Sequence, residues 1–227
     1  ASSYLLQAYK RDYLVQLYYG APIPDEFIEN RVFRTRVFSS FSPADIETDD
    51  LFSPDISPME YPCGGIGDFR TPSLVIKNAD GNFVTDVRYR SHKIYAGKPD
   101  FSPLPSAYVN ADDEAETLEI TAADKLTGAE VKLFYTVFEK AGVITRRATV
   151  KNVSEKPMFI EKFHSACIDI PDAEYDCIDM YGKHFFECGT ERVPLGHGIR
   201  KISSSRGMSG HSHNAFAAFA ERETGEE

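Results

Sequence analysis

The sequence predicts an all-β protein with few or no helices, and three observations support this fold class. Residues 131–137 and 144–150 alternate between apolar and polar side chains, which is typical of strands with one buried face. Turn-forming segments separate these runs, for example at 126–128 and 140–142. No segment shows the sustained apolar spacing of an amphipathic helix. We therefore expect one large antiparallel β-sandwich over residues 1–227.

The central strands are expected to pair in sequence order as an antiparallel meander. An Asp-Gly pair favours a tight hairpin turn at Asn78–Asn82, because glycine readily adopts the positive φ that such turns need. Residues 215–220 fit a short helix by composition and a strand end by their aromatic side chains. The expected strands of the meander cover residues 118–122, 131–137, 144–150 and 158–170.

Arg146 is expected on the apolar face of its strand, on the same side as Ile144 and Ala148. A buried guanidinium without an acceptor costs on the order of 3–5 kcal/mol, so it needs a partner. We expect a structural ion pair, with Glu139 or Glu161 as the candidate carboxylates.

The formal net charge of −10 opposes binding to nucleic acid and gives no attraction to anionic membranes. No segment approaches the roughly 20 apolar residues of a membrane-spanning helix, and we expect no secretory leader. The four cysteines form no Cys-x-x-Cys pair, so free thiols in a reducing cytosol are expected. We predict a cytoplasmic protein with neither nucleic acid nor membrane as partner.

Three familiar types of functional site are not supported. The Gly-Gly-Ile-Gly segment at 64–67 lacks the Lys and Ser or Thr of a nucleotide-binding loop. His211 and His213 have no evident carboxylate or cysteine partner for a metal. The serines at 203–205 have no base at a fixed spacing. We expect no cofactor and no metal, and the sequence selects no catalytic pair among its 35 Asp and Glu residues.

The most informative segment is the loop at residues 61–72, which combines glycines and prolines with Asp68, Phe69 and Arg70. Its composition predicts a rigid, sharply bent loop, and such loops often carry binding residues. Asp68 and Arg70 lie two positions apart and would point the same way from an extended backbone. Together they could hold vicinal sugar hydroxyls as acceptor and donors. The alternative is that the two side chains only brace the loop against each other.

Several short motifs occur in an order and spacing that resemble a known family. Over essentially the whole chain, the set resembles the N-terminal domain of family 36 glycoside hydrolases, chiefly α-galactosidases. The motifs are Leu17-Tyr18-Tyr19-Gly20, the segment from Tyr61-Pro62 to Asp68-Phe69-Arg70-Thr71-Pro72, Gly97-Lys98-Pro99, Leu104-Pro105, Glu116-Thr117-Leu118-Glu119-Ile120, Val143-Ile144-Thr145-Arg146, Ser204-Ser205-Arg206-Gly207 and Asn214-Ala215-Phe216.

The resemblance implies a large antiparallel β-supersandwich of the galactose mutarotase-like type, placed before a catalytic (β/α)8 barrel. In that family the barrel carries the aspartate nucleophile and the aspartate acid/base of a retaining mechanism. The resemblance implies that this chain has no catalytic residue, that the substrate is an α-galactoside, and that the barrel is a partner of this domain. In tetrameric members this domain lends a loop to a neighbouring active site, which makes Asp68, Phe69 and Arg70 the candidate substrate-binding residues.

Two departures from the family pattern bear on substrate preference. The family usually has a Trp near residues 182–187, whereas this chain contains no Trp and has Phe185 and Phe186 there. A phenylalanine could take over part of a sugar-stacking role. Asn214-Ala215-Phe216 also lacks the usual Pro. An autonomous carbohydrate-binding module and a structural spacer domain remain alternatives to a domain that shapes the active site.

Overall fold

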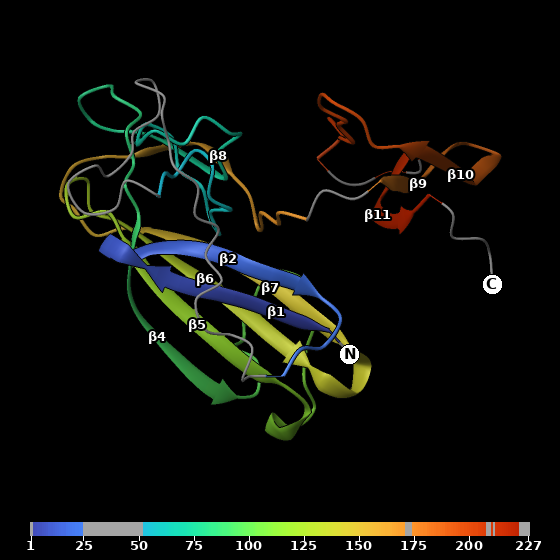
Figure 1. Ribbon diagram of the computed structural model, residues 1–227, viewed down its shortest axis with the longest axis horizontal. Helices are drawn as coiled ribbons and strands as arrows, with labels where there is room; N and C mark the ends of the chain where they lie inside the picture. Colours follow the sequence, from blue (N-terminus) through green and yellow to red (C-terminus); the bar gives the residue numbers. More distant parts are fainter. Residues whose placement is uncertain (1, 25–51, 171–173, 208–209, 211, 223–227) are drawn as a thin grey trace. The chain divides into compact units, whose positions relative to one another are not determined.

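The computed structural model describes residues 2–24, 52–170, 174–207, 210 and 212–222 (Figure 1). The chain divides into two compact units, Ala1–Asp169 and Ile170–Glu227, and each is described by itself. That residues 1–227 form a single sandwich stays a prediction.

The first unit is built from strands joined by turns and longer loops. Among its described residues, the helical turns Lys10–Asp12, Asp112–Glu114 and Glu139–Ala141 are each three residues long. In the part of the chain that the structure describes, no helix has the length and apolar character to cross a lipid bilayer. The all-β prediction with few helices is confirmed. The strands are β1 (Ser3–Tyr9), β2 (Tyr13–Gly20), β3 (Leu74–Lys77), β4 (Arg88–Ala96), β5 (Glu116–Ala123), β6 (Ala129–Phe138), β7 (Val143–Asn152) and β8 (Phe159–Phe163).

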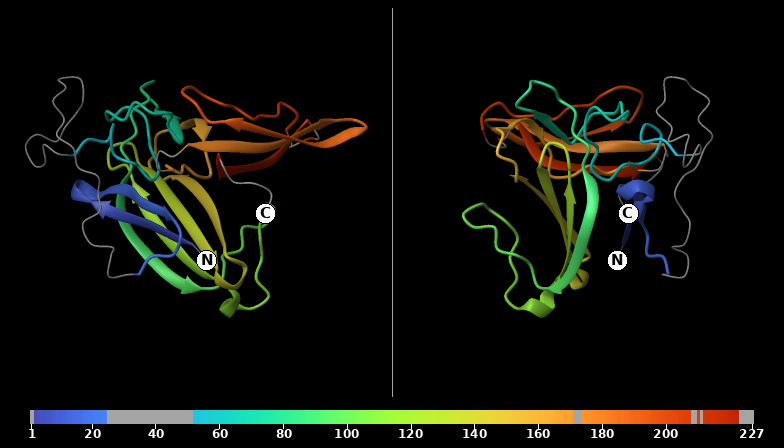
Figure 2. Two further views of the ribbon diagram at one scale, coloured as in Figure 1. Left: turned by 45° about the vertical axis from the view of Figure 1, so that its right-hand side comes forward. Right: turned by 90° about the vertical axis from the view of Figure 1, so that its left-hand side faces the viewer.

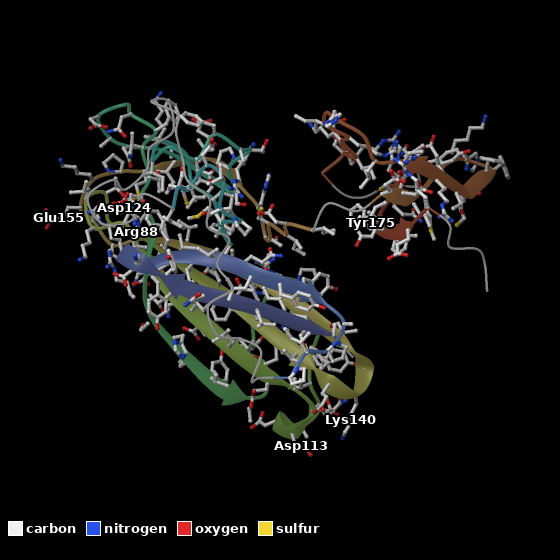
Figure 3. The ribbon with its side chains drawn as sticks, viewed as in Figure 1. Arg88, Asp113, Asp124, Lys140, Glu155 and Tyr175 are labelled. Atoms are coloured by element: carbon white, nitrogen blue, oxygen red, sulfur yellow. The ribbon has the colours of Figure 1, made fainter. Side chains whose placement is uncertain are left out.

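A four-stranded antiparallel sheet in the order β4-β5-β6-β7 is the centre of this unit. The register of β6 and β7 sets Val131 opposite Val150 and Leu133 opposite Ala148. These are the apolar positions that the alternation assigned to one face, and that face is buried. Charged turn residues lie at the two ends of the sheet, with Asp113 at one end (Figure 3). The predicted strands and their faces are therefore confirmed for this part of the meander.

The β1–β2 hairpin forms the second layer over this apolar face. Leu14 of β2 is buried in the same core as Ile120 and Leu133, and Tyr4 and Leu6 of β1 pack against it. The hairpin lies alongside the sheet in each view (Figures 1 and 2). Burial of these side chains between two antiparallel layers supplies the main apolar contribution to the stability of the unit.

The opposite face of the sheet is also partly covered. Phe134 and Thr136, which alternate with the core positions of β6, are both buried. The ring of Phe101, from the loop after β4, meets Phe134 edge-on at 5.0 Å, and the hydroxyls of Thr136 and Thr117 are hydrogen-bonded at 2.8 Å. Period-two patterning alone does not reveal this cover, because the covering loop has no strand pattern of its own.

The expectation that residues 158–170 extend the meander is wrong. β8 pairs with β3 in a separate two-stranded sheet, and residues 164–170 are not in a strand. The turn after β7 redirects the chain, since Asn152 donates from its side chain to the carbonyl of Lys156 at 2.7 Å. The buried side chains of Leu74 and Ile76 then find their strand partner in β8.

The predicted turn at Asn78–Asn82 is present, but it does not form a β-hairpin. The amides of Asn78 and Gly81 make the turn hydrogen bonds, each 2.9 Å long, and Gly81 has a φ of +87°. The Asn78 side chain donates to the carbonyl of Val84 at 2.9 Å. This contact holds the following residues as a loop, so β3 does not pair with the segment that follows the turn.

The second unit is a three-stranded antiparallel sheet. Its strands are β9 (Tyr175–Lys183), β10 (Phe186–Pro194) and β11 (His213–Glu221), in the order β10-β9-β11. Residues 215–220 belong to β11, so the strand alternative is correct and the helix alternative is wrong for this segment. β11 pairs with β9, with Phe219 opposite Cys177, and this pairing satisfies the backbone hydrogen bonds of the segment. Composition alone could not distinguish the two alternatives.

Candidate functional site

The loop at residues 61–72 leads into β3 and is fixed at both ends. The hydroxyl of Tyr61 donates to the carbonyl of His164 at 2.6 Å. The amide of Ser73 donates to the carbonyl of Pro62 at 2.8 Å. These bonds close the loop at its base, so that the residues between them form a defined bend.

Gly65 makes the bend possible. Its φ is +97°, and a Cβ added there would lie 2.8 Å from the Cα of Val84. An L-residue would therefore meet both backbone strain and a steric clash at this position. The predicted role of glycine in a sharply bent loop is confirmed for Gly65.

Asp68 and Arg70 interact directly with each other. Nε of Arg70 donates to Oδ1 of Asp68 at 2.7 Å, and the amide of Arg70 donates to the same oxygen at 3.2 Å. Asp68 is only 7% exposed. Burial raises the pKa of its carboxyl above the usual value, against the opposing effect of Arg70. The bracing alternative therefore describes the geometry of this pair.

The guanidinium of Arg70 also ties the loop to two other segments. Nη1 donates to Oδ2 of Asp169 at 3.0 Å, and Nη2 donates to the carbonyl oxygens of Pro54, at 3.0 Å, and Ser57. Arg70 thus joins three segments that are distant in sequence. A planar group with five N–H donors is suited to such a junction.

Phe69 stands between the two bracing residues and faces outward. Its side chain is 73% exposed, and its amide donates to Oδ1 of Asp55 at 3.3 Å. An aromatic ring held above a cross-linked loop loses little conformational freedom when it binds a ligand or a neighbouring surface. The structure therefore brings the three predicted residues together, with Phe69 as the one that is presented to solution.

The buried oxygen Oδ2 of Asp68 has no hydrogen-bond partner among the described residues. It also lacks solvent exposure, so a sugar hydroxyl cannot reach it in this conformation. Direct contact of Asp68 with substrate stays a prediction that would require the loop to open. Sequence reasoning did not identify the supporting residues Asp55, Ser57 and Asp169, because nothing local links them to the loop.

Arg146 is a structural residue with a different partner from those expected. Its Nη2 donates to Oε1 of the fully buried Glu60, and its Nη1 donates to the carbonyl of Cys167 at 2.7 Å. The expectation of an ion pair is confirmed, whereas Glu139 and Glu161 as partners are wrong. Glu60 lies in the loop that follows Phe52, so only the tertiary fold places it beneath β7.

The hydroxyls of Tyr4 and Tyr135 complete this buried cluster, each donating to a Glu60 carboxylate oxygen at 2.5 Å. Burial, together with the Glu60 carboxylate, raises the pKa of both tyrosines well above the usual value. Both hydroxyls therefore stay protonated and act as donors. With no solvent access to Glu60, the cluster stabilises the packing of β1 on the sheet.

The remaining candidate features are the histidines and the cysteines. His211 lies outside the described residues, and within the described ranges no three His, Cys, Asp or Glu side chains are grouped to hold a metal. All four cysteines are free thiols. Burial raises the pKa of Cys63 to about 12, so this thiol is unreactive at neutral pH.

The second unit presents an exposed aromatic at the turn between β9 and β10. Phe185 is 89% exposed, has a φ of +64°, and lies 4.1 Å from the ring of His184 between centroids. This is the position at which the resemblance raised a stacking role for phenylalanine. That role stays a prediction.

Comparison with known proteins is consistent with this architecture. The family model described as the glycosyl hydrolase family 36 N-terminal domain matches residues 12–227. The chain is 38% identical over 225 residues to α-galactosidase AgaA of Geobacillus stearothermophilus, covering 99% of this chain and 31% of AgaA. It is also 38% identical to the bifunctional α-galactosidase/sucrose kinase AgaSK of Mediterraneibacter gnavus, covering 99% of this chain and 24% of AgaSK.

Solved structures show the same similarity. The α-galactosidase AgaB of Geobacillus stearothermophilus superposes with a TM-score of 0.90 at 39% identity, covering 98% of this chain and 30% of AgaB. A variant of AgaA in complex with raffinose gives a TM-score of 0.91 at 38% identity, covering 98% of this chain and 31% of AgaA. The chain spans about a third or less of these proteins. It belongs to the glycosyl hydrolase family 36 N-terminal domain family.

Proposed function

We propose that the protein containing this chain is a retaining α-galactosidase that hydrolyses terminal α-galactosides, and that this chain is its non-catalytic N-terminal domain. Several relatives are α-galactosidases, and AgaA variants have been solved in complex with raffinose and stachyose. The two catalytic aspartates would be supplied by a barrel domain outside this chain. We place the whole protein in the cytosol, as a homotetramer.

In this proposal the Asp68–Arg70 loop shapes the entrance of an active site in a neighbouring subunit. The observation that carries it is the 73% exposure of Phe69 on a loop whose flanking residues are fixed by ion pairs. An aromatic ring can cover the apolar face of a galactosyl unit. In the same proposal, Asp68 and Arg70 hold that ring in place.

Kinetics of the whole enzyme with raffinose test this role. Phe69→Ala is expected to raise KM about fivefold, because an aromatic contact contributes about 1 kcal/mol. kcat is expected to stay within about twofold, since the ring does not touch the reacting atoms in this proposal. Tyr108→Ala is the matched control, because Tyr108 is 79% exposed on another loop. An unchanged KM for Phe69→Ala would instead favour the spacer alternative.

A further inference from the structure

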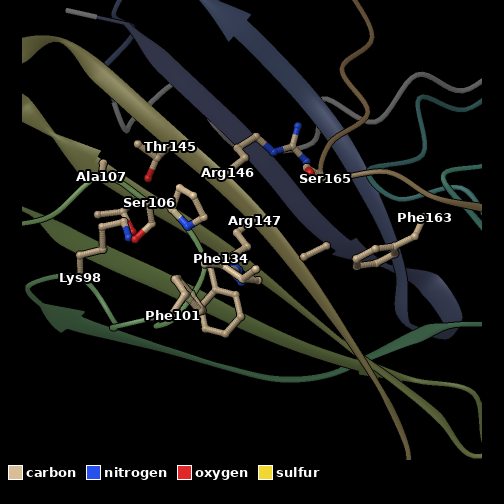
Figure 4. Close-up of a pocket in the computed structure, with 14 residues that line it drawn as sticks. Lys98, Phe101, Ser106, Ala107, Phe134, Thr145, Arg146, Arg147, Phe163 and Ser165 are labelled. Carbon is tan, nitrogen blue, oxygen red and sulfur yellow. The ribbon is translucent and has the colours of Figure 1, made fainter. Parts of the chain in front are cut away.

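A cavity of about 570 Å³ opens on the face of the sheet that does not carry the main core (Figure 4). Phe134 and Thr145 of the sheet line it together with Lys98, Phe101 and residues 104–107 of the loop after β4, and Phe163 and Ser165 also contribute. Asp68, Phe69 and Arg70 do not line it. The cavity is therefore separate from the loop on which the proposed function depends.

Two cations lie close to one aromatic ring in this cavity. The Cζ atom of Arg147 lies 3.8 Å from the centroid of the Phe101 ring, and Nζ of Lys98 lies 5.0 Å from the same centroid. Both charged side chains are half-buried. Stacking on Phe101 fixes the plane of the guanidinium and leaves its N–H edge available for hydrogen bonds.

No carboxylate lies within ion-pair distance of Lys98 or Arg147 among the residues that the structure describes, and the cavity lining contains no Asp or Glu. This is unusual in a chain with 35 acidic residues and a net charge of −10. Arg146, which also lines the cavity, shows the contrast, because it has its own buried carboxylate in Glu60. Lys98 and Arg147 thus lack the ion-pair partner that Arg146 has.

The electrostatic cost of this arrangement falls on Lys98. Burial, and then the positive charge of Arg147, lower the pKa of Lys98, and Asp100 opposes this only in part. The carboxylate of Asp100 already accepts a hydrogen bond from the amide of Ser102 at 2.9 Å. An anion in the cavity would remove the repulsion between the two cations and would find hydroxyl groups at Ser106 and Thr145.

We propose that this cavity binds the oxyanion group of a small molecule, a phosphate or a carboxylate, with Arg147 and Lys98 as its cationic partners. The guanidinium would donate two parallel hydrogen bonds, which is the geometry that arginine offers to phosphate and carboxylate. Lys98, which lies 5.0 Å from the same ring, would add a second positive charge. The site is independent of the proposed α-galactosidase activity, which acts on a neutral substrate.

Titration calorimetry with inorganic phosphate on the intact protein tests this site, in a non-phosphate buffer of constant ionic strength. The wild-type protein is expected to show saturable binding, and Arg147→Met is expected to weaken it about tenfold through loss of a charge-assisted pair. Arg147→Lys keeps the charge without the planar donor edge, and is expected to lie between the two. Lys125→Met removes an exposed charge that does not line the cavity, and is expected to leave binding unchanged.

A second titration with acetate distinguishes a carboxylate site from a phosphate site. Both probes are oxyanions, but acetate carries a single negative charge, whereas phosphate can carry two at neutral pH. Saturable binding of either probe that is weakened in Arg147→Met supports the proposal. Absence of binding to the wild-type protein by both probes would overturn it, as would equal affinity in the wild type and Arg147→Met. If Arg147→Met fails to fold, as judged by circular dichroism, Lys98→Met replaces it in the same comparison.

Discussion

Glu60 has no exposed surface and accepts hydrogen bonds from Tyr4, Tyr135 and Arg146, which lie on three different strands. Removing one of these partners leaves a charged or polar group without compensation in the core. The cost of such a change is therefore set by the group that remains as much as by the group that is removed.

Arg146→Leu is expected to lower the free energy of unfolding by about 3–5 kcal/mol, because the buried Glu60 carboxylate loses its counter-ion. Urea unfolding measures this change. Lys151→Leu, at the exposed end of the same strand, is the control and should change the free energy by less than about 0.5 kcal/mol. The double variant with Glu60→Gln, which removes the charge and keeps an acceptor for Tyr4 and Tyr135, should recover part of the loss. A double variant less stable than Arg146→Leu would contradict this explanation.

A pH dependence of stability is expected from Glu119. Burial of its carboxyl is outweighed by bonds to Lys93, at 2.9 Å, and Lys132, at 3.0 Å, so the pKa of Glu119 is lowered in the folded state. A lowered folded pKa means that the stabilisation is present above the unfolded value near 4.5. It is lost as the pH falls through the folded pKa.

Comparison of the wild type with Glu119→Gln by urea unfolding at about pH 6 and about pH 3.5 tests this expectation. The wild type should be the more stable of the two at the higher pH, and the difference should shrink at the lower pH. If the difference in unfolding free energy between the two proteins is the same at both pH values, the ionisation of Glu119 does not contribute to the pH dependence of stability.

The residue pairs also show where sequence reasoning stops. Asp68 and Arg70 lie two positions apart, so their proximity could be predicted from local geometry. The partner of Arg146 lies 86 positions away in Glu60, and sequence reasoning considered only the nearer carboxylates Glu139 and Glu161. The expected burial of Arg146 showed that it needs an acidic partner. Which carboxylate serves as that partner depends on the folded topology.

Among the elements, β6 and β7 were predictable because their signal is local. Each has an alternation that is complete within its own sequence, and a short turn fixes their pairing. The pairing of β8 was not predictable in this way. Its partner β3 lies more than 80 residues earlier, and no feature of β8 itself distinguishes that strand from the nearer edge of the meander.

Gly65 allows a direct test of the loop as a structural element. Gly65→Ala is expected to lower the free energy of unfolding by about 1–3 kcal/mol, because the new Cβ adds backbone strain at φ +97° and meets the Cα of Val84. Gly64→Ala is the matched control, since a Cβ at Gly64 has no heavy atom within 4 Å. Thermal unfolding of both variants measures the difference. Equal stability would show that the bend does not need glycine.

At the scale of the whole molecule, the chain is a domain of known family, and in the proposed function the activity is completed by another part of the protein. The chain spans about a third of AgaA, and its described residues include no group of three His, Cys, Asp or Glu side chains that could hold a metal. In the proposed function, the contribution of this chain to activity is the surface that it presents to other parts of the protein. The braced loop under Phe69 is the feature of the first unit that best fits this role.

In the proposed function, Arg70 acts by holding Phe69 in place and does not contact the sugar itself. A double-mutant cycle in KM for raffinose, with Phe69→Ala, Arg70→Met and both together in the whole enzyme, measures this most directly. We expect Arg70→Met to raise KM in the wild-type background, and to raise it almost no further in the Phe69→Ala background. If the two effects instead multiply, Arg70 contributes independently of the ring, and the proposed role of the brace is contradicted.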